Sequence, residues 1–388
     1  MRLHVTCAPG LTGLLSAELS ALLLLAGRPA DALTASNALG VEAVVVDVDD
    51  ACGFDRIALL NLGLGLATSV RVELASFSAS QFPQLVRKLR QVAWGPWVSP
   101  TLPLDLRVRS VKSRLYHTKA IAERTRRAIE ESLRSPSLAT LDEGSDVPHT
   151  RIHVDALENR FHVTVDTSGE PLYRRGYRLA TGKAPLRPDL ARALVLVSGW
   201  DRATPLGDPF CGAGTVLVEA ALLATGRAPG AGRSFAFQYA PAHVATVLDA
   251  AAAQLSERVS PRTALPPLLG SDRDAGVIAS AHENAERAGV AQHLTLSVAP
   301  VSDAPVFTQP LGPRVLVSNP PYGVRVGDER TLRNLYQRTG SLVRSLPQGS
   351  RAAFLTPPQR ARDFGLTLAR AFESNHGGQH VVASVTQG

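Results

Sequence analysis

The chain has 388 residues, 45% of them hydrophobic, and a net charge of +7 with an isoelectric point near 9.7. This length suits two or three domains and a substantial core. Its three widely spaced cysteines form no CxxC pair, which argues against a zinc ribbon, an iron–sulfur site or a disulfide scaffold and favours a reducing compartment. The apolar run at 21–27 is too short to span a bilayer, so we expect a cytoplasmic protein with no membrane partner.

The first part of the chain, to about residue 165, alternates strand-like and helix-like segments. Apolar periodicity, β-branched runs and turn residues predict the elements. In chain order these are a strand at 3–8, a helix at 12–25, a strand at 41–48, a helix at 80–92, a strand at 104–111, a helix at 117–133, a loop at 135–150 and a β-hairpin at 151–169 that turns near Glu158-Asn159.

Positive charge is concentrated in residues 87–127, which hold eleven Lys and Arg residues against two acidic ones. A solvated basic face is one interpretation. We favour a surface that binds a nucleic acid, because such clusters are typical of proteins that contact phosphates. The expected contacts are Arg107, Arg109, Lys112, Arg114, Lys119, Arg124 and Arg127.

A basic connector follows the main boundary, which we place near residue 170, and leads into a helix at 189–197. From about residue 203 the pattern becomes strand, helix, strand, helix, which predicts a parallel sheet with helices on both faces. The expected strands lie at 203–210, 266–272, 293–298, 314–320 and 351–357, and the expected helices at 211–224, 274–289 and 331–346. Ligands of such sheets bind beyond the carboxyl ends of the strands.

The segment DPFCGAGT, Asp208 to Thr215, follows the first of these strands. Gly212 and Gly214 allow a tight turn and a close approach of the backbone to a ligand. The helix that follows offers free N–H groups to a polar or anionic group. No Gly-Lys-Ser/Thr follows, so the turn is not a phosphate-binding P-loop. The glycine pair alone is also compatible with an ordinary turn.

Acidic residues follow the next two strands. Asp272 stands at the tip of the second strand, where a carboxylate can accept hydrogen bonds from ribose hydroxyls. Capping of the next helix is the alternative role for Asp272, and it is the role that we assign to Asp274. Asp303, after the third strand, is a candidate contact for an adenine amino group.

The fourth strand ends in Asn319-Pro320-Pro321-Tyr322. The prolines stop the strand, so the Pro320 carbonyl and the Asn319 side-chain oxygen become two acceptors. Two acceptors suit an exocyclic amino group, which has two donors, and Tyr322 offers a flat face on which a base can stack. A stiff turn with a core tyrosine is the alternative, which DPFCGAGT and GSD at the matching strand ends make less favoured.

DPFCGAGT, GSDRD and SNPPYG, in this order, resemble the class I S-adenosylmethionine-dependent methyltransferases that methylate amino groups through an (N/D)PP(Y/F) motif. Four longer stretches resemble the THUMP-containing RNA guanine-N2 methyltransferases: LDLRVRSVKSRLYHTKAIAERTRRAIEESL, RIHVDALENRFHVTVDTSGEPLYRRGYR, RRGYRLATGKAPLRPDLARALVLVSGW and GRAPGAGRSFAFQ. This resemblance covers most of the chain and is strongest from Leu104 to Leu355. The C-terminal tail departs from the family pattern.

The resemblance implies an α/β fold: a C-terminal Rossmann-like methyltransferase domain with a seven-stranded, mainly parallel sheet, after an N-terminal α+β ferredoxin-like and THUMP module. The expected domains are ferredoxin-like at 1–70, an RNA-binding THUMP domain at 71–170, a connector at 171–200 and the methyltransferase domain at 201–388. It implies S-adenosylmethionine as cofactor and Asn319, Pro320, Pro321 and Tyr322 as the catalytic segment. The implied cofactor contacts are Pro188, Asp208, Pro209, Gly212, Gly214, Thr215, Asp272 and Asp303.

The favoured function is methylation of the exocyclic N2 of a guanosine in structured RNA, either tRNA or large-subunit 23S rRNA, by a monomer without a metal. One alternative is an adenine-N6 methyltransferase acting on DNA or RNA, which the THUMP-like half disfavours for DNA. Another is a non-catalytic RNA-binding protein with a methyltransferase fold, which the intact motifs disfavour.

Cysteine and histidine offer no competing chemistry. RNA cytosine-C5 methyltransferases use a cysteine nucleophile, but Cys211 lies inside the cofactor turn, so we expect a structural role. The histidines without metal-ligand spacing, expected to be surface or local structural residues, are His117, His153, His162 and His282.

Overall fold

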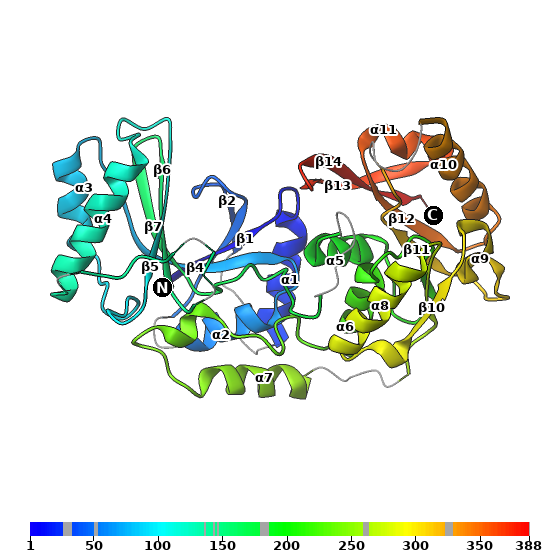
Figure 1. The fold of residues 1–388 in the computed structure, drawn as a ribbon, viewed down its shortest axis with the longest axis horizontal. Helices are drawn as coiled ribbons and strands as arrows, with labels where there is room; N and C mark the ends of the chain where they lie inside the picture. Colours follow the sequence, from blue (N-terminus) through cyan, green and yellow to red (C-terminus); the bar gives the residue numbers. More distant parts are fainter. Residues whose placement is uncertain are drawn as a thin grey trace. The chain divides into compact units, whose positions relative to one another are not determined.

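A computed structural model describes residues 1–25, 33–49, 53–135, 137–142, 144–145, 147–178, 186–258, 264–322 and 329–387. The expected connector is therefore described only outside 179–185, and Gly323 of SNPPYG lies outside the described residues. The chain forms two compact units, each built around its own seven-stranded sheet (Figure 1). The N-terminal unit comprises residues 1–7, 15–172 and 232–255, and the C-terminal unit comprises residues 8–14, 173–231 and 256–388.

The sheet of the N-terminal unit has the strand order β2-β3-β1-β4-β7-β6-β5 and is antiparallel except between β5 and β6. Its elements are β1 (Arg2–Cys7), α1 (Thr12–Leu25), β2 (Leu33–Ser36), β3 (Ala43–Asp47), α2 (Gly53–Gly63), β4 (Ala67–Ser78), α3 (Phe82–Leu89), β5 (Leu104–Val111), α4 (Thr118–Leu133), β6 (Thr150–Leu157) and β7 (Arg160–Asp166). The predicted hairpin is β6–β7, and its turn residues Glu158 and Asn159 both have positive φ.

The first four strands and two helices follow the order β-α-β-β-α-β with the strand order β2-β3-β1-β4, which is a ferredoxin-like arrangement. β4 continues past this part and pairs with β7, so one sheet runs through both parts of the unit. The domain boundary predicted at residue 70 therefore falls inside β4. The twelve-residue strand was missed because its second half mixes apolar and polar residues without regular alternation.

One face of this sheet is polar. Residues directly opposite each other on neighbouring strands share a face. By register, one face joins His4 to Arg71 and, further along, Arg107 to His153 and Arg109 to Asp155. The opposite face is apolar, with Leu3 and Val5 set against valines of β3 and β4. Charged groups on the polar face therefore neutralise one another along the sheet.

Residues 232–255 belong to the N-terminal unit although they follow the first strand of the C-terminal unit. This segment contains η2 (Ala236–Tyr239) and begins α7 (Val247–Arg258). Phe235 and Phe237 stack at 5.8 Å and are buried, and the Phe237 amide donates to Thr167 O at 3.0 Å. The segment thus completes the core of the N-terminal unit.

The C-terminal unit has the strand order β10-β9-β8-β11-β12-β14-β13, as expected for a seven-stranded, mainly parallel sheet. β8 to β12 are parallel, whereas β13 and β14 are antiparallel. Its elements are α5 (Pro188–Val197), β8 (Leu206–Asp208), α6 (Thr215–Thr225), β9 (Leu268–Asp272), α8 (Ala275–Arg287), η3 (Ala291–His293), β10 (Leu294–Val298), η4 (Val301–Asp303), α9 (Pro305–Thr308), β11 (Val315–Ser318), α10 (Glu329–Arg344), β12 (Arg351–Thr356), α11 (Pro358–Ala361), η5 (Arg362–Phe364), β13 (Leu368–His376) and β14 (Gln379–Thr386).

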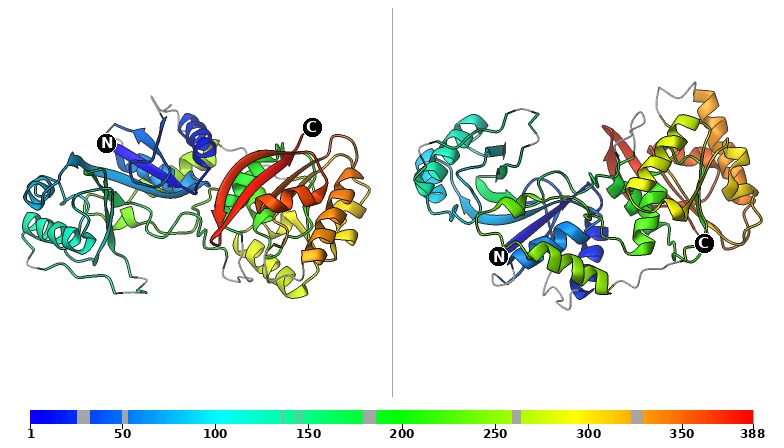
Figure 2. Two further views of the ribbon diagram at one scale, coloured as in Figure 1. Left: turned by 90° about the horizontal axis from the view of Figure 1, so that it is seen from above. Right: turned by 60° about the horizontal axis from the view of Figure 1, so that its bottom comes forward.

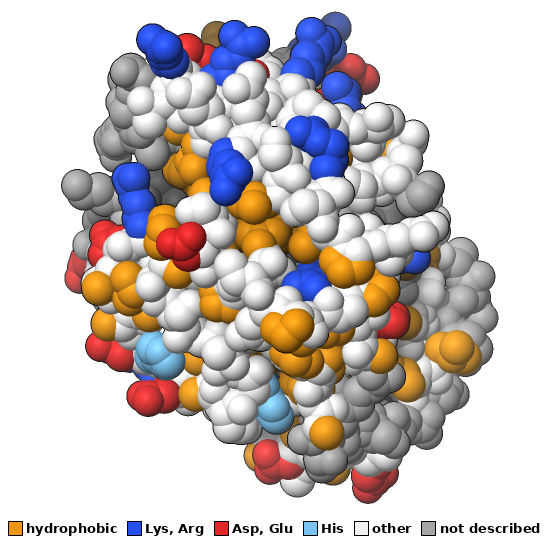
Figure 3. Space-filling model, turned by 90° about the vertical axis from the view of Figure 1, so that its right-hand side faces the viewer, with side chains coloured by type: hydrophobic (Ala, Val, Ile, Leu, Met, Phe, Trp, Pro, Cys, Tyr) orange, Lys and Arg blue, Asp and Glu red, His pale blue; other side chains and the backbone are white. Residues whose placement is uncertain are grey.

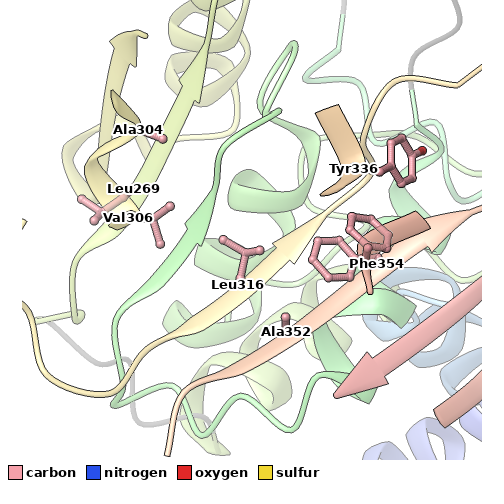
Figure 4. Packing of buried hydrophobic residues seen from close by; sticks show 8 residues of the cluster. Leu269, Ala304, Val306, Leu316, Tyr336, Ala352 and Phe354 are labelled. Atoms are coloured by element: carbon pink, nitrogen blue, oxygen red, sulfur yellow. The ribbon is translucent and has the colours of Figure 1, made fainter. Parts of the chain in front are cut away.

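The parallel strands are apolar on both faces, so helices cover both. On one face Leu269, Leu316 and Phe354 pack against α9, α10 and η5 (Figure 4). On the other face, the Cα hydrogen of Gly270 points at Leu217 of α6, because a Cβ there would lie 2.5 Å from that side chain. Polar residues of these strands therefore gather at the strand ends.

The C-terminal hairpin was not predicted as such. β13 and β14 pair through a two-residue turn, Gly377-Gly378, in which both glycines have positive φ. The two views of Figure 2 show the hairpin, in red, at the edge of the C-terminal sheet. Within the described residues, no helix combines the length and apolarity that crossing a membrane requires.

Candidate active site

The site lies at the switch point of the C-terminal sheet. The chain runs outward from β8 through β9 to β10 and then returns to β11 on the other side of β8. In open α/β sheets, a ligand crevice forms where the strand order reverses, beyond the carboxyl ends. The ends of β8 and β11 carry DPFCGAGT and SNPPY, so the fold brings the two predicted motifs next to each other.

Asp208 links these motifs. Its carboxylate is 2% exposed, and its Oδ1 accepts hydrogen bonds from Ser318 Oγ at 2.6 Å and from the Phe210 amide at 3.0 Å. Burial raises the pKa of Asp208 to about 7, and the nearby Asp272 adds to this although the two hydrogen bonds oppose it. A carboxyl with a raised pKa therefore lies directly behind the predicted catalytic segment.

The glycine turn is shaped by Asp272. The Gly212 amide donates to Asp272 Oδ2 at 3.2 Å, and the other oxygen accepts from the Asp274 amide at 3.1 Å. Gly214 caps α6 with φ +80°, and a Cβ on Gly212 would meet no atom of the described residues within 4 Å. Within the part of the chain that the structure describes, the turn therefore leaves space above Gly212 and presents the N-terminus of α6 to it. Asp274 caps α8, as expected, accepting from the amides of its first turn.

The other predicted cofactor contacts lie in the same unit. Pro209 is buried next to Asp208, Thr215 is the buried first residue of α6, and Pro188 is the buried first residue of α5, a helix that packs against α6. Asp303 is exposed at the end of η4, which follows β10.

The segment after β11 is fixed at several points. Asn319 Nδ2 donates to Leu355 O at 2.7 Å, and Tyr336 Oη donates to Pro321 O at 3.3 Å. Tyr322 Oη lies 2.9 Å from His376 Nδ1. Among the described residues, no hydrogen-bond donor reaches Asn319 Oδ1 or the Pro320 carbonyl, so both remain available as acceptors.

Cys211 packs as a structural residue would. Its thiol is buried, and a Cβ on Gly270 would lie 3.3 Å from the sulfur. Burial raises the pKa of Cys211 well above its usual value, and the carboxylates of Asp208 and Asp272 add to this. A thiolate nucleophile is therefore disfavoured at this position.

A buried ionic cluster beneath the turn was not predicted. Glu219, in the middle of α6, is fully buried and accepts from Arg175 Nε at 3.2 Å and from Tyr177 Oη at 3.1 Å. Arg192 of α5 lies 3.8 Å away. The cluster ties the start of the connector and α5 to the helix that begins at the glycine turn. A lone glutamate inside the apolar run TVLVEAALLA is the sequence signal that could have indicated it.

The predicted phosphate contacts all lie in the N-terminal unit. Arg107, Arg109 and Lys119 line a pocket of about 480 Å³, together with Arg71. Lys112, Arg114 and Lys119 are exposed around the loop between β5 and α4. This basic surface therefore joins the pocket to the start of α4.

Two predicted contacts on α4 are engaged within the chain. Arg124 lies over the Phe82 ring at 4.0 Å and donates to Ala120 O at 3.0 Å. Arg127 is 81% exposed and pairs with Glu131 at 3.1 Å. Arg127 is therefore the more accessible of the two.

A histidine cluster on the polar face also escaped sequence reasoning. Glu73 Oε2 lies 3.0 Å from His4 Nε2 and 2.9 Å from His162 Nδ1. Although burial opposes it, hydrogen bonds from His162 and His4 hold the pKa of Glu73 well below its usual range. His162 is 8% exposed, so its role is structural rather than at the surface. The three groups could hold a metal ion by position, but the distances are those of hydrogen bonds.

The C-terminal unit carries basic charge of its own. In Figure 3, Lys and Arg side chains gather mainly in the upper part of the face, acidic side chains are scattered around its rim, including the top, and histidine side chains lie in its lower half. Helix α10 contributes exposed arginines, namely Arg330, Arg333, Arg338 and Arg344.

Comparisons with known proteins agree with this geometry. Residues 175–376 match the family UPF0020, described as "RMKL-like, methyltransferase domain". The chain is 31% identical to "Putative RNA methyltransferase YpsC" of Bacillus subtilis, over 81% of this chain and 85% of that protein. It is 31% identical to "Ribosomal RNA large subunit methyltransferase K/L" of Syntrophotalea carbinolica over 90% of this chain, which spans about half of that relative's length. The crystal structure of SMU.472 complexed with SAH superposes with a TM-score of 0.83 at 26% identity, covering 100% of this chain and 98% of that one.

Proposed function

Because the chain belongs to the UPF0020 family of RMKL-like methyltransferases, we propose that it methylates the exocyclic N2 amino group of a guanosine in structured RNA, with S-adenosylmethionine as methyl donor. One observation supports an amino group as the group that is methylated. Asn319 Oδ1 and the Pro320 carbonyl stand side by side in sequence, without a donor among the described residues, at the strand end next to the glycine turn. RNA is supported by the names of the relatives, which include an RNA and a ribosomal RNA methyltransferase.

The residues around the turn fit the methyl donor. The open space above Gly212 admits a ligand close to the backbone, and the first amides of α6 are free of a side-chain cap. Asp272 keeps lone pairs for ribose hydroxyls after accepting two amides, since a carboxylate has about four acceptor positions. When bound, S-adenosylmethionine supplies an electrophilic methyl group. We assign its contacts to the residues that line the turn: Pro188, Asp208, Pro209, Gly212, Gly214, Thr215, Asp272 and, further out, Asp303.

The catalytic segment would act by orientation. The two acceptors bind the two N–H donors of the amino group, which directs the nitrogen lone pair out of the plane of the base. The nitrogen gains a bond to the methyl carbon, the carbon–sulfur bond breaks, and the nitrogen then loses a proton to water. This order of steps needs no strong base, because the proton leaves after the new bond has formed. Tyr322 would stack against the extruded base.

The N-terminal unit would hold the RNA. Its exposed cations around the loop between β5 and α4 can contact phosphates, and the RNA is then recognised by shape rather than by base edges. We keep the THUMP assignment for this unit as part of the proposal. Large-subunit rRNA and tRNA are both compatible with a surface of this kind.

The test is identification of the methylated nucleoside. Purified protein and tritiated S-adenosylmethionine are incubated separately with unmodified tRNA, ribosomal RNA and DNA, and each digest is separated. Label in N2-methylguanosine from one RNA supports the proposal and identifies its substrate. Label in N6-methyladenine would keep the amino-group chemistry and overturn the choice of base, since the same two acceptors fit the adenine N6. Asn319→Ala, processed in parallel, shows whether the label depends on the catalytic segment.

A further inference from the structure

The hydrogen bond at the far end of the Tyr322 ring has no part in the mechanism above. Its partner His376 is the last residue of β13 and is 7% exposed. We propose that His376 is a positioning residue, which orients the Tyr322 ring as the stacking surface for the target base. The proposal rests on the proposed function, because it assumes that Tyr322 faces a base.

The hairpin gives His376 a fixed position. His376 pairs with Gln379 across the Gly377-Gly378 turn, and the two strands pair from Leu368 to His376 with one irregularity between Arg370 and Phe372. β12 and β14 separate β13 from β11, so SNPPY extends from the middle of the sheet to its edge to make this contact. The contact is therefore set by strand pairing rather than by a loop.

The other contacts of the segment leave the ring unrestrained. The bonds at Leu355 O and from Tyr336 fix the Asn319 amide and the Pro321 backbone. The Tyr322 side chain has two torsions of its own, and a hydrogen bond at the phenol end restrains both. Burial raises the pKa of Tyr322, so its hydroxyl stays protonated and can donate to His376.

A double-mutant cycle tests the coupling. Y322F and H376A are each expected to lower kcat about fivefold, the effect of one net hydrogen bond, and to leave the Kd for S-adenosylmethionine unchanged. The double variant is expected to be no slower than the slower single variant, because both substitutions remove the same bond. H380A is the matched control, since His380 lies on the same hairpin, is half exposed and pairs with Glu373. If the loss of kcat in the double variant equals the product of the losses in the two single variants, the proposal is overturned.

Two further variants separate positioning from packing. H376F keeps the ring volume without the acceptor, and we expect it to be as slow as H376A. H376N keeps a polar group near the hydroxyl, and we expect partial recovery. Full activity of H376F would show that His376 only fills space.

A readout independent of activity distinguishes failure of the contact from failure of the proposed function. In ¹⁵N NMR of the histidine side chains, Y322F is expected to shift the Nδ1 resonance of His376 and to leave that of His380 in place. No shift would overturn the contact itself. A clear shift in a protein that labels no nucleoside would overturn the proposed function, and with it the stacking role of Tyr322.

Discussion

The two sheets of this molecule differ in where their charged residues lie. In the N-terminal sheet, acidic, basic and histidine side chains are spread over a whole face, from His4 and Glu73 on one side to Arg107 and Arg109 on the other. In the C-terminal sheet, the parallel strands are apolar, and the polar groups stand at their carboxyl ends, as Asp208 does. When charged residues are spread over a face, a neighbouring charge can take the place of a partner that a substitution removes. A charged residue at one of a few positions has no such replacement. Single substitutions should therefore act strongly in the C-terminal unit and weakly in the N-terminal unit.

The largest effect is expected where a single buried carboxylate serves several partners. Glu219→Ala leaves Arg175, whose side chain is 1% exposed, without its buried partner, so unfolding should become easier by about 3–5 kcal/mol. Urea denaturation measures this. Glu283→Ala is the control, because Glu283 is 58% exposed and its pair with Arg287 should contribute at most about 0.5 kcal/mol. Equal losses in the two variants would mean that burial does not set the strength of an ion pair in the C-terminal unit.

The next effect concerns catalysis. Asn319→Ala removes one of the two acceptors, and kcat should fall about 10²–10³-fold, as for the loss of one preorganised partner in other active sites. The Kd for S-adenosylmethionine, measured by calorimetry, should stay near that of the wild type. Asn334→Ala on the exposed side of α10 should change neither quantity. Lost cofactor affinity in Asn319→Ala would assign the residue to the cofactor site instead.

The contribution of Asp208 to the free energy of unfolding is expected to depend on pH. Its pKa of about 7 lies above the ordinary value of 3.8, so the protonated carboxyl stabilises the fold and this contribution is lost as pH rises from about 4 to about 7. The free energy of unfolding of the wild type should therefore fall relative to Asp208→Asn by about 1 kcal/mol per pH unit in this range. Urea denaturation at several pH values measures the difference. A difference that does not change with pH would mean that the carboxyl of Asp208 ionises normally.

The smallest effect is expected in the N-terminal unit. Replacing Arg107 and Lys119 by Ala should reduce the slope of log K against log salt by about 1.4–1.8, which is about 0.7–0.9 per lost phosphate contact. RNA binding at several salt concentrations measures the slope. Arg126→Ala should leave the slope unchanged, because its guanidinium already donates to the carbonyls of Leu138 and Leu104. If the double variant no longer binds RNA at all, the N-terminal unit also depends on a few single residues, as the C-terminal unit does.

Local patterns predicted much of the fold and of the site. The five parallel strands of the C-terminal sheet, the β6–β7 hairpin and the Asp274 cap follow from signals that lie within a few residues of one another, whereas the count of seven strands came from the family resemblance. The methyl donor and the methyltransferase family likewise follow from short motifs, and the comparisons support both. The guanine, the individual site residues and the domain boundaries remain predictions.

The contacts that escaped prediction join residues far apart in sequence. Ser318 lies 110 residues from Asp208, His162 lies 89 from Glu73, and His376 lies 54 from Tyr322. Strand order brings these pairs together, and the periodicity of a strand carries no information about which strand becomes its neighbour. Residues 232–255 are the same case on a larger scale, because their sequence does not indicate which unit they complete.

Because residues 232–255 complete the N-terminal unit, the order in which the chain is synthesised at the ribosome affects when that unit can fold. The N-terminal unit includes Phe235 and Phe237, so it cannot close its core when residue 172 emerges. At about 5–20 residues per second, translation must continue for on the order of ten seconds before residue 255 is available. During that interval β8 and α6 emerge from the ribosome, whereas β11 and the predicted catalytic segment follow only after residue 255. The half-built protein therefore passes through a stage in which both cores wait for later residues, a natural point for a chaperone to act.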